Sequence, residues 1–169
     1  MRNEKGSTLL EMMVTLTVFS VLLFAAAGAF DASQESLDWN YRALSLQKEL
    51  RKILLTMTQE MRESSPSSPN PITTGPNSIT FQIPSSVSGN LVTGWTQITY
   101  GLGLNNMVTR AVNGQTTTLG NNVQALNFVY PVDPVTAPRT VQIQITGSQT
   151  TLKRTMTRTI TGQVVLRNR

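Results

Sequence analysis

The side chains that could support chemistry in this chain are concentrated beside its first apolar segment. Glu11 is a single carboxylate placed directly before Met12–Phe30, a run that contains no charged residue. This run approaches the roughly 20 residues needed to cross ~30 Å of hydrocarbon. Gly6 precedes the run, whereas a secretory signal carries its small residues after the apolar core. Cleavage after Gly6 would therefore leave the apolar helix on the mature protein and create an ammonium group at Ser7.

This arrangement resembles the type IV prepilin family, which includes pilins and the pseudopilins of type II secretion. The family motif is a short basic leader ending in Gly, then an aliphatic pair and a Glu, and Gly6, Leu9, Leu10 and Glu11 match it. The resemblance implies that a prepilin peptidase cleaves between Gly6 and Ser7 and that Ser7 is N-methylated. Ser7 departs from the Phe that the family usually has there. The resemblance also implies that Glu11 is an assembly residue that meets the N-terminal ammonium of a neighbouring subunit, since a carboxylate in lipid is costly without a partner.

A plain membrane anchor is the alternative interpretation of residues 7–30, with Glu11 marking only the interface. A carboxylate at the helix centre costs ~2.5–3.5 kcal/mol on insertion scales, so a position near one end is expected in either case. A plain anchor does not require Gly6 directly before the segment and Glu11 five residues later. The motif therefore favours the prepilin interpretation.

The charges that flank the apolar run predict its orientation. Arg2 and Lys5 precede it, and Asp31, Glu35 and Asp38 follow it with no basic residue before position 42. An excess of Lys and Arg on the short side favours leaving that side in the cytoplasm. We expect a single-pass protein of the bacterial inner membrane, with a cytoplasmic N-terminus and a periplasmic C-terminal domain that then enters a pilus or pseudopilus.

The helix is predicted to continue beyond the membrane because no proline occurs between Ser7 and Ser64. An apolar stripe with helical spacing supports this continuation: Leu46, Leu50, Ile53, Met57 and Met61. Leu37, Tyr41 and Leu44 are expected to extend the stripe upstream. Prolines at positions 66, 69 and 71 then end the helix.

The remaining chain is predicted to form antiparallel strands. Val141, Ile143 and Ile145 alternate with glutamines, which indicates a sheet with one buried and one wet face. Asn113-Gly114 is typical of a type I′ hairpin turn. The expected fold is α+β and pilin-like, with a long N-terminal helix packed on antiparallel sheet. The expected parts are a leader at 1–6, a transmembrane helix at 7–30, its amphipathic continuation at 31–65 and a periplasmic β domain at 66–169.

The β portion is also similar to a subclass of the family. The patterns Ile98–Tyr100, Val108–Arg110, Asn113-Gly114 and Val123–Tyr130, with the ending Val164–Arg169, resemble the J-type minor pseudopilins and the W-type minor pilins. This resemblance implies a minor subunit rather than a major one.

Composition argues against an enzyme. Cysteine and histidine are absent, which excludes Cys/His metal sites and histidine-based catalysis. Asp133 is the only carboxylate after Glu63, so no paired-carboxylate site and no acid-rich calcium site is expected there. We therefore predict no cofactor and no metal.

The basic balance of the second half leaves one rival of another class, a nucleic-acid-binding pilin. Seven basic residues follow residue 64 against Asp133 alone, and Lys153, Arg154 and Arg158 are the candidate contacts. Aromatic platforms for single strands are missing, and basic faces are usually only solvated, so nucleic acid is not the expected partner. An even alternation from Leu152 to Ile160 would place both arginines in one row, which predicts an edge strand or a bulge.

The function expected from the sequence is that of a structural subunit in a type II secretion pseudopilus, within a tip or priming complex. The alternative is a minor pilin of a type IV pilus that serves adhesion, motility or DNA uptake. The expected partners are other minor and major pilin-like subunits, prepilin peptidase and the inner-membrane assembly platform. The residues leave open the choice between the two systems, and they name no cargo.

Overall fold

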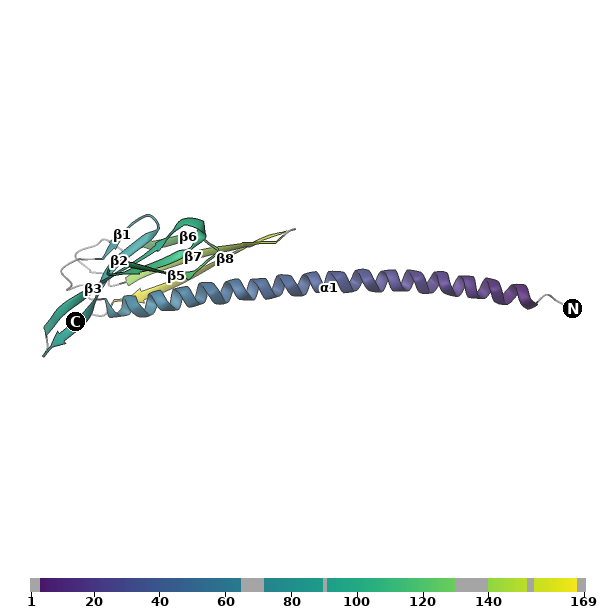
Figure 1. The fold of residues 1–169 in the computed structure, drawn as a ribbon, viewed down its shortest axis with the longest axis horizontal. Coiled ribbons are helices and arrows are strands. Elements are labelled where there is room, and N and C mark those ends of the chain that lie inside the picture. The colour runs from purple at the N-terminus through teal and green to yellow at the C-terminus, as the bar shows by residue number, and fades with distance from the viewer. Residues whose placement is uncertain (1–3, 65–71, 90, 130–139, 152–153, 167–169) are drawn as a thin grey trace. The chain divides into compact units, whose positions relative to one another are not determined.

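The computed structural model describes residues 4–64, 72–89, 91–129, 140–151 and 154–166, with side chains described from Thr8 onward. Helix α1 spans Glu4–Glu63 without a break. Two compact units divide within this helix, Met1–Arg42 and Ala43–Arg169, and each is described by itself. The first unit is helical throughout its described residues. The second unit holds the end of α1 and all the described strands (Figure 1).

The strands of the second unit form two antiparallel sheets. One sheet has the order β1-β2-β3-β4-β5, and its strands are β1 Thr73–Thr74, β2 Ser78–Ser88, β3 Leu91–Leu102, β4 Val108–Val112 and β5 Gln115–Gly120. A short 3-10 helix, η1 Leu104–Asn106, connects β3 to β4. The other sheet has the order β6-β7-β8, with β6 Val123–Val129, β7 Thr140–Thr150 and β8 Thr155–Val165. One helix with antiparallel sheet confirms the α+β, pilin-like fold class.

The core of the second unit lies between α1 and the sheets. The predicted stripe is confirmed, because Leu46, Leu50, Ile53, Met57 and Met61 are each no more than 1% exposed. Strand residues at alternate positions complete the core: Ile79, Phe81, Ile98, Tyr100, Val108, Leu126, Val141, Ile143 and Ile145. Gln142 and Gln144 are exposed between the buried residues of β7, as the alternation predicts.

The upstream extension of the stripe is wrong. Leu37, Tyr41 and Leu44 are exposed. Leu44 precedes Leu46 by two residues, which places it about 200° around an α-helix and therefore on the opposite face. The buried stripe begins at Leu46.

Three glycines let α1 approach the sheets closely. A Cβ on Gly120 in β5 would lie 2.7 Å from Ile53 Cδ1, and one on Gly147 in β7 would lie 2.8 Å from Leu50 Cδ2. A Cβ on Gly162 in β8 would lie 2.8 Å from a Leu54 methyl carbon. At each of these positions, a side chain of α1 occupies the space that a strand side chain would otherwise fill.

Two turn and edge predictions are also confirmed. Asn113 and Gly114 connect β4 to β5 with positive φ angles of 49° and 83°, and Val112 faces Gln115. Strand β8 lies at the edge of its sheet as predicted, but the charged row itself is not observed, because Arg154 precedes β8 and Met156 is buried whereas Arg158 is exposed. Leu152 falls outside the described residues.

Candidate functional site

The candidate assembly residue, Glu11, lies exposed on α1. The hydroxyl groups that follow it are satisfied by the helix itself: Thr15 Oγ1 donates to the Glu11 carbonyl at 2.7 Å, and Ser20 Oγ donates to the Leu16 carbonyl at 2.7 Å. Thr17 Oγ1 likewise donates to carbonyls one turn earlier. Such back-bonding removes the need for an outside partner. Among the described side chains from Leu9 to Phe30, the Glu11 carboxylate is the polar group without a contact in the chain.

The helix around Glu11 presents apolar side chains outward. Large side chains from Leu9 to Phe30 are more than half exposed, with Phe24 the most exposed at 82%. Among the described residues, α1 is the helix that is long and apolar enough to cross a membrane. An apolar surface of this extent requires lipid or other protein to cover it. The apolar helix and the N-terminal motif together suggest anchoring in the inner membrane.

Gly6 and Ser7 lie in the first turns of α1, where only the backbone is described. A peptide bond inside a helix has its backbone groups held in hydrogen bonds, so this turn must open before a peptidase can bind it. Glycine weakens a helix by about 1 kcal/mol relative to alanine, which makes opening at Gly6 easier.

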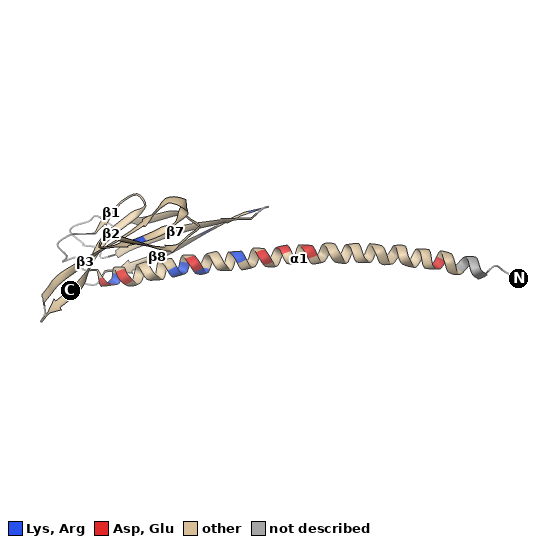
Figure 2. Ribbon diagram, viewed as in Figure 1, with Lys and Arg blue, Asp and Glu red and all other residues tan. Residues whose placement is uncertain are grey.

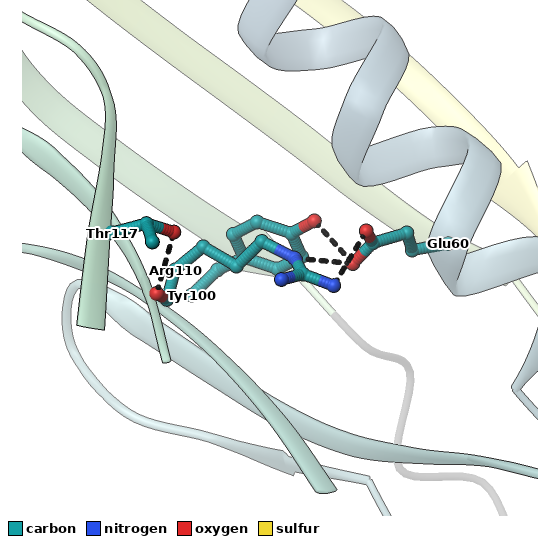
Figure 3. Close-up of polar contacts among 4 residues, drawn as sticks. All are labelled: Glu60, Tyr100, Arg110 and Thr117. Carbon is teal, nitrogen blue, oxygen red and sulfur yellow. Dashed lines mark hydrogen bonds and ion pairs between the residues drawn. The ribbon is translucent and has the colours of Figure 1, made fainter. Parts of the chain in front are cut away.

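A second polar cluster joins the end of α1 to the first sheet (Figure 3). Glu60 on α1 receives the Tyr100 hydroxyl from β3 at 2.6 Å and Arg110 Nε from β4 at 3.0 Å, both on Oε2. Arg110 Nη2 lies 2.9 Å from Glu60 Oε1, so the ion pair is bidentate. On β5, Thr117 Oγ1 donates to the Arg110 carbonyl at 3.2 Å. One carboxylate thus ties two strands to the helix.

Burial and charge set the protonation of this cluster. Burial, followed by the hydrogen bond to Glu60, raises the pKa of the Tyr100 hydroxyl well above its ordinary value of 10.0. The hydrogen bond to Glu60 raises the pKa of the Arg110 guanidinium. Tyr100 is therefore a neutral donor and Arg110 a permanent cation, which is the pairing that a carboxylate requires. The cluster fastens α1 to β3 and β4, with Tyr100 and Arg110 as the donors.

The structure describes two of the three candidate nucleic-acid residues. Arg154 and Arg158 are exposed, and Arg154 lies in the turn before β8, where its carbonyl accepts from Thr151 N at 2.8 Å. Lys153 lies outside the described residues. Arg110, which contributed to the basic balance, is paired with Glu60. Nucleic-acid binding stays an untested alternative, and the Glu60 carboxylate neutralises one of the positive charges that suggested it.

No cluster of three or more potential metal ligands occurs among the described residues. Sequence reasoning missed both the Glu60–Tyr100–Arg110 cluster and the three glycines under α1. A glycine inside a strand often marks close approach of another element, so Gly147 and Gly162 carried a usable signal. The polar cluster left no signal in the sequence, because Glu60 and Arg110 are 50 residues apart in the chain.

Comparison with known proteins bears on the first 27 residues. Residues 1–27 match the family described as the prokaryotic N-terminal methylation motif. The match includes Gly6, Ser7 and Glu11, and it indicates a type IV pilin-like prepilin, a class that is processed by prepilin peptidase and assembles with other pilins. No curated protein and no solved structure matches the chain.

Proposed function

We propose that this chain is a minor pilin-like structural subunit of a type II secretion pseudopilus, acting in its tip or priming complex. The observation that carries the proposal is the Glu11 carboxylate, which has no partner among the side chains that the structure describes and precedes an apolar helix surface. A buried charge is tolerable only beside an opposite charge. Cleavage after Gly6 would supply such a charge, the ammonium of Ser7 on a neighbouring subunit.

This pairing would act as a check on axial register. A new subunit gains the ion pair only when its N-terminus lies beside the carboxylate of the subunit already in place. A misplaced subunit leaves both charges in lipid, which insertion scales place at a few kcal/mol per group. The β-rich unit fastened to α1 by Ile53, Leu50 and Glu60 would then be carried into the fibre with its helix.

Processing provides the first test. Gly6→Val should block cleavage, because the peptidase pocket before the cut is expected to accept no larger side chain. The membrane fraction should then contain a precursor that retains residues 1–6, measured by intact-protein mass spectrometry. Gly28→Val is the matched control, since a Cβ at Gly28 meets nothing within 4 Å and the variant should be processed normally. A mature wild-type N-terminus other than Ser7 would contradict the assignment of the site.

A deletion strain separates secretion from pilus use. Loss of the chain should leave secreted enzymes trapped in the periplasm while surface pili persist. A strain that secretes normally and loses its pili would instead make the chain a minor pilin of a type IV pilus.

A further inference from the structure

The end of α1 carries a second face, opposite the buried stripe. Its exposed residues recur at helical spacing, and we call them the basic helix face: Leu44, Lys48, Arg51, Lys52, Leu55 and Arg62. Leu44 and Leu55 are 53% and 66% exposed. Figure 2 shows basic residues along this part of the helix. The steps of four, three and four from Leu44 through Lys48 and Arg51 to Leu55 are those of a helix that packs along another helix.

The face is basic because the acidic residues of the same stretch are used elsewhere. Glu49 Oε1 accepts the Asn121 backbone N–H at 2.7 Å, at the end of β5. Glu60 is held by Tyr100 and Arg110. Both carboxylates turn toward the sheets, so neither neutralises the opposite side of the helix. Glu63, in the last turn of α1, is the remaining exposed acid of residues 43–63.

The basic residues of this face make no ion pair in the part of the chain that the structure describes. The Arg110–Glu60 pair lies on the side of the helix that meets the sheets. Lys48, Arg51 and Lys52 are exposed and flanked by two exposed leucines. Apolar anchors beside charges of one sign suit a partner helix that carries the opposite sign, since charge complementarity fixes register and excludes wrong partners.

We propose that the basic helix face binds the acidic stretch of helix that follows the apolar segment of a neighbouring pilin-like subunit. This chain carries a stretch of that kind itself: Asp31, Glu35 and Asp38 are exposed on α1 and separated by steps of four and three. No basic residue lies between Phe30 and Arg42. The inference rests on the proposed function, because it needs subunits that stack with their helices side by side. It adds a second register contact, in water, to the one that Glu11 makes in lipid.

Photo-cross-linking in the native host tests the contact. A benzoylphenylalanine residue replaces Leu55 in the full chain, and a matched variant carries it at Thr157, which is exposed on β8. Irradiation should join position 55 to a pilin-like subunit, and peptide mapping should place the linked residue in the acidic stretch after its apolar segment. Position 157 should give no such adduct.

Charge reversal tests the chemistry. The triple variant Lys48→Glu, Arg51→Glu, Lys52→Glu should lower the yield of the position-55 adduct about tenfold, because complementary charges become like charges. The neutral variant Lys48→Gln, Arg51→Gln, Lys52→Gln should lie between it and the wild type. Arg154→Glu with Arg158→Glu is the control and should leave the yield within about twofold, since these arginines lie outside the proposed contact. The fluorescence of Trp39 and Trp95 reports whether each variant is folded.

A second set of cross-links distinguishes failure of this contact from failure of the proposed function. Cysteine cross-links between apolar segments, placed in residues 12–30, report assembly in the same cells. If these form while the position-55 adduct is missing, the basic helix face is not a docking surface and the proposed function stands. If neither forms, the proposed function fails and this contact fails with it. An adduct with phospholipid would make the face a membrane contact, and an adduct of unchanged yield after charge reversal would refute the acidic partner.

Discussion

The two ends of α1 are built from similar apolar side chains but find their partners in different places. From Leu46 to Met61 the apolar stripe is covered by the sheets of the same chain. From Leu9 to Phe30 the apolar side chains are exposed on every side of the helix. The first arrangement is complete within one molecule, whereas the second leaves an apolar surface that lipid or other protein must cover.

This difference separates folding from assembly along one helix. A substitution in the covered part removes contacts that the isolated chain makes, so it should change the free energy of unfolding. Under the proposed function, a substitution in the uncovered part removes contacts that the chain makes only in the assembled fibre, so it should change recruitment. Polar groups follow the same division: Glu60 has two partners in its own chain, and the Glu11 carboxylate has none among the described residues.

Ile53→Ala should produce the largest change in stability. Ile53 is 1% exposed, and truncation of such a residue costs ~2–5 kcal/mol through lost burial and the cavity that remains. Urea unfolding of the full chain in detergent, followed by the fluorescence of Trp39 and Trp95, measures the change. Leu55→Ala and Leu22→Ala are the matched controls, because both side chains are more than 60% exposed and should shift stability by less than about 0.5 kcal/mol. Equal losses at positions 53 and 22 would remove the distinction between the two parts.

A pair of glycine substitutions should sharpen the contrast. Gly147→Ala places a methyl group 2.8 Å from Leu50 Cδ2 and 3.1 Å from the Asn122 carbonyl oxygen, and such overpacking costs ~1–3 kcal/mol. Gly28→Ala meets nothing within 4 Å and should stabilise the helix by up to about 1 kcal/mol. Thermal unfolding of the two variants in the same detergent compares them. A Gly147→Ala variant as stable as the wild type would show that α1 does not press against β7.

The smallest expected change is a loss of stability at alkaline pH, caused by ionisation of the Tyr100 hydroxyl. The folded-state pKa of its hydroxyl is raised above the ordinary value of 10.0, so the stabilisation is complete below pH 10 and is lost as the pH rises toward the folded-state pKa. Between pH 9 and pH 11 the contribution of this hydroxyl to the free energy of unfolding should fall by about 1.4 kcal/mol, the equivalent of one pKa unit. Tyr100→Phe removes this part of the pH dependence while other titrating groups remain. Identical pH profiles for wild type and variant would contradict the burial of the hydroxyl against Glu60.

Local patterns in the sequence predicted much of this fold. The end of α1, the buried stripe from Leu46 and the Asn113-Gly114 hairpin all follow from proline chemistry, helical period and positive φ angles. The division of the strands into two sheets did not follow, because alternation shows which face of a strand is buried but not which strand lies beside it.

The candidate site divides in the same way. Gly6, Ser7 and Glu11 lie within six consecutive residues, so sequence alone could propose them, and residues 1–27 match the methylation-motif family. Glu60 and Arg110 come together only through the packing of α1 on β4, which no local pattern encodes. The upstream stripe failed because Leu37, Tyr41 and Leu44 follow helical spacing on the face opposite Leu46. Period alone does not say which of two apolar faces the sheet will cover.

The most direct test of the central claim is Glu11→Ala, measured by cross-linking between subunits through cysteines placed in residues 12–30. The chain has no native cysteine, so each cross-link reports the introduced site. We expect leader cleavage, membrane insertion and the urea midpoint to stay unchanged, because the described structure gives the Glu11 carboxylate no contact within the chain. Cross-links to neighbouring subunits should fall sharply, since the ammonium of the neighbour loses its counter-charge in lipid. Cross-linking equal to the wild type, toward both the tip and the base of the fibre, would contradict a docking role for Glu11.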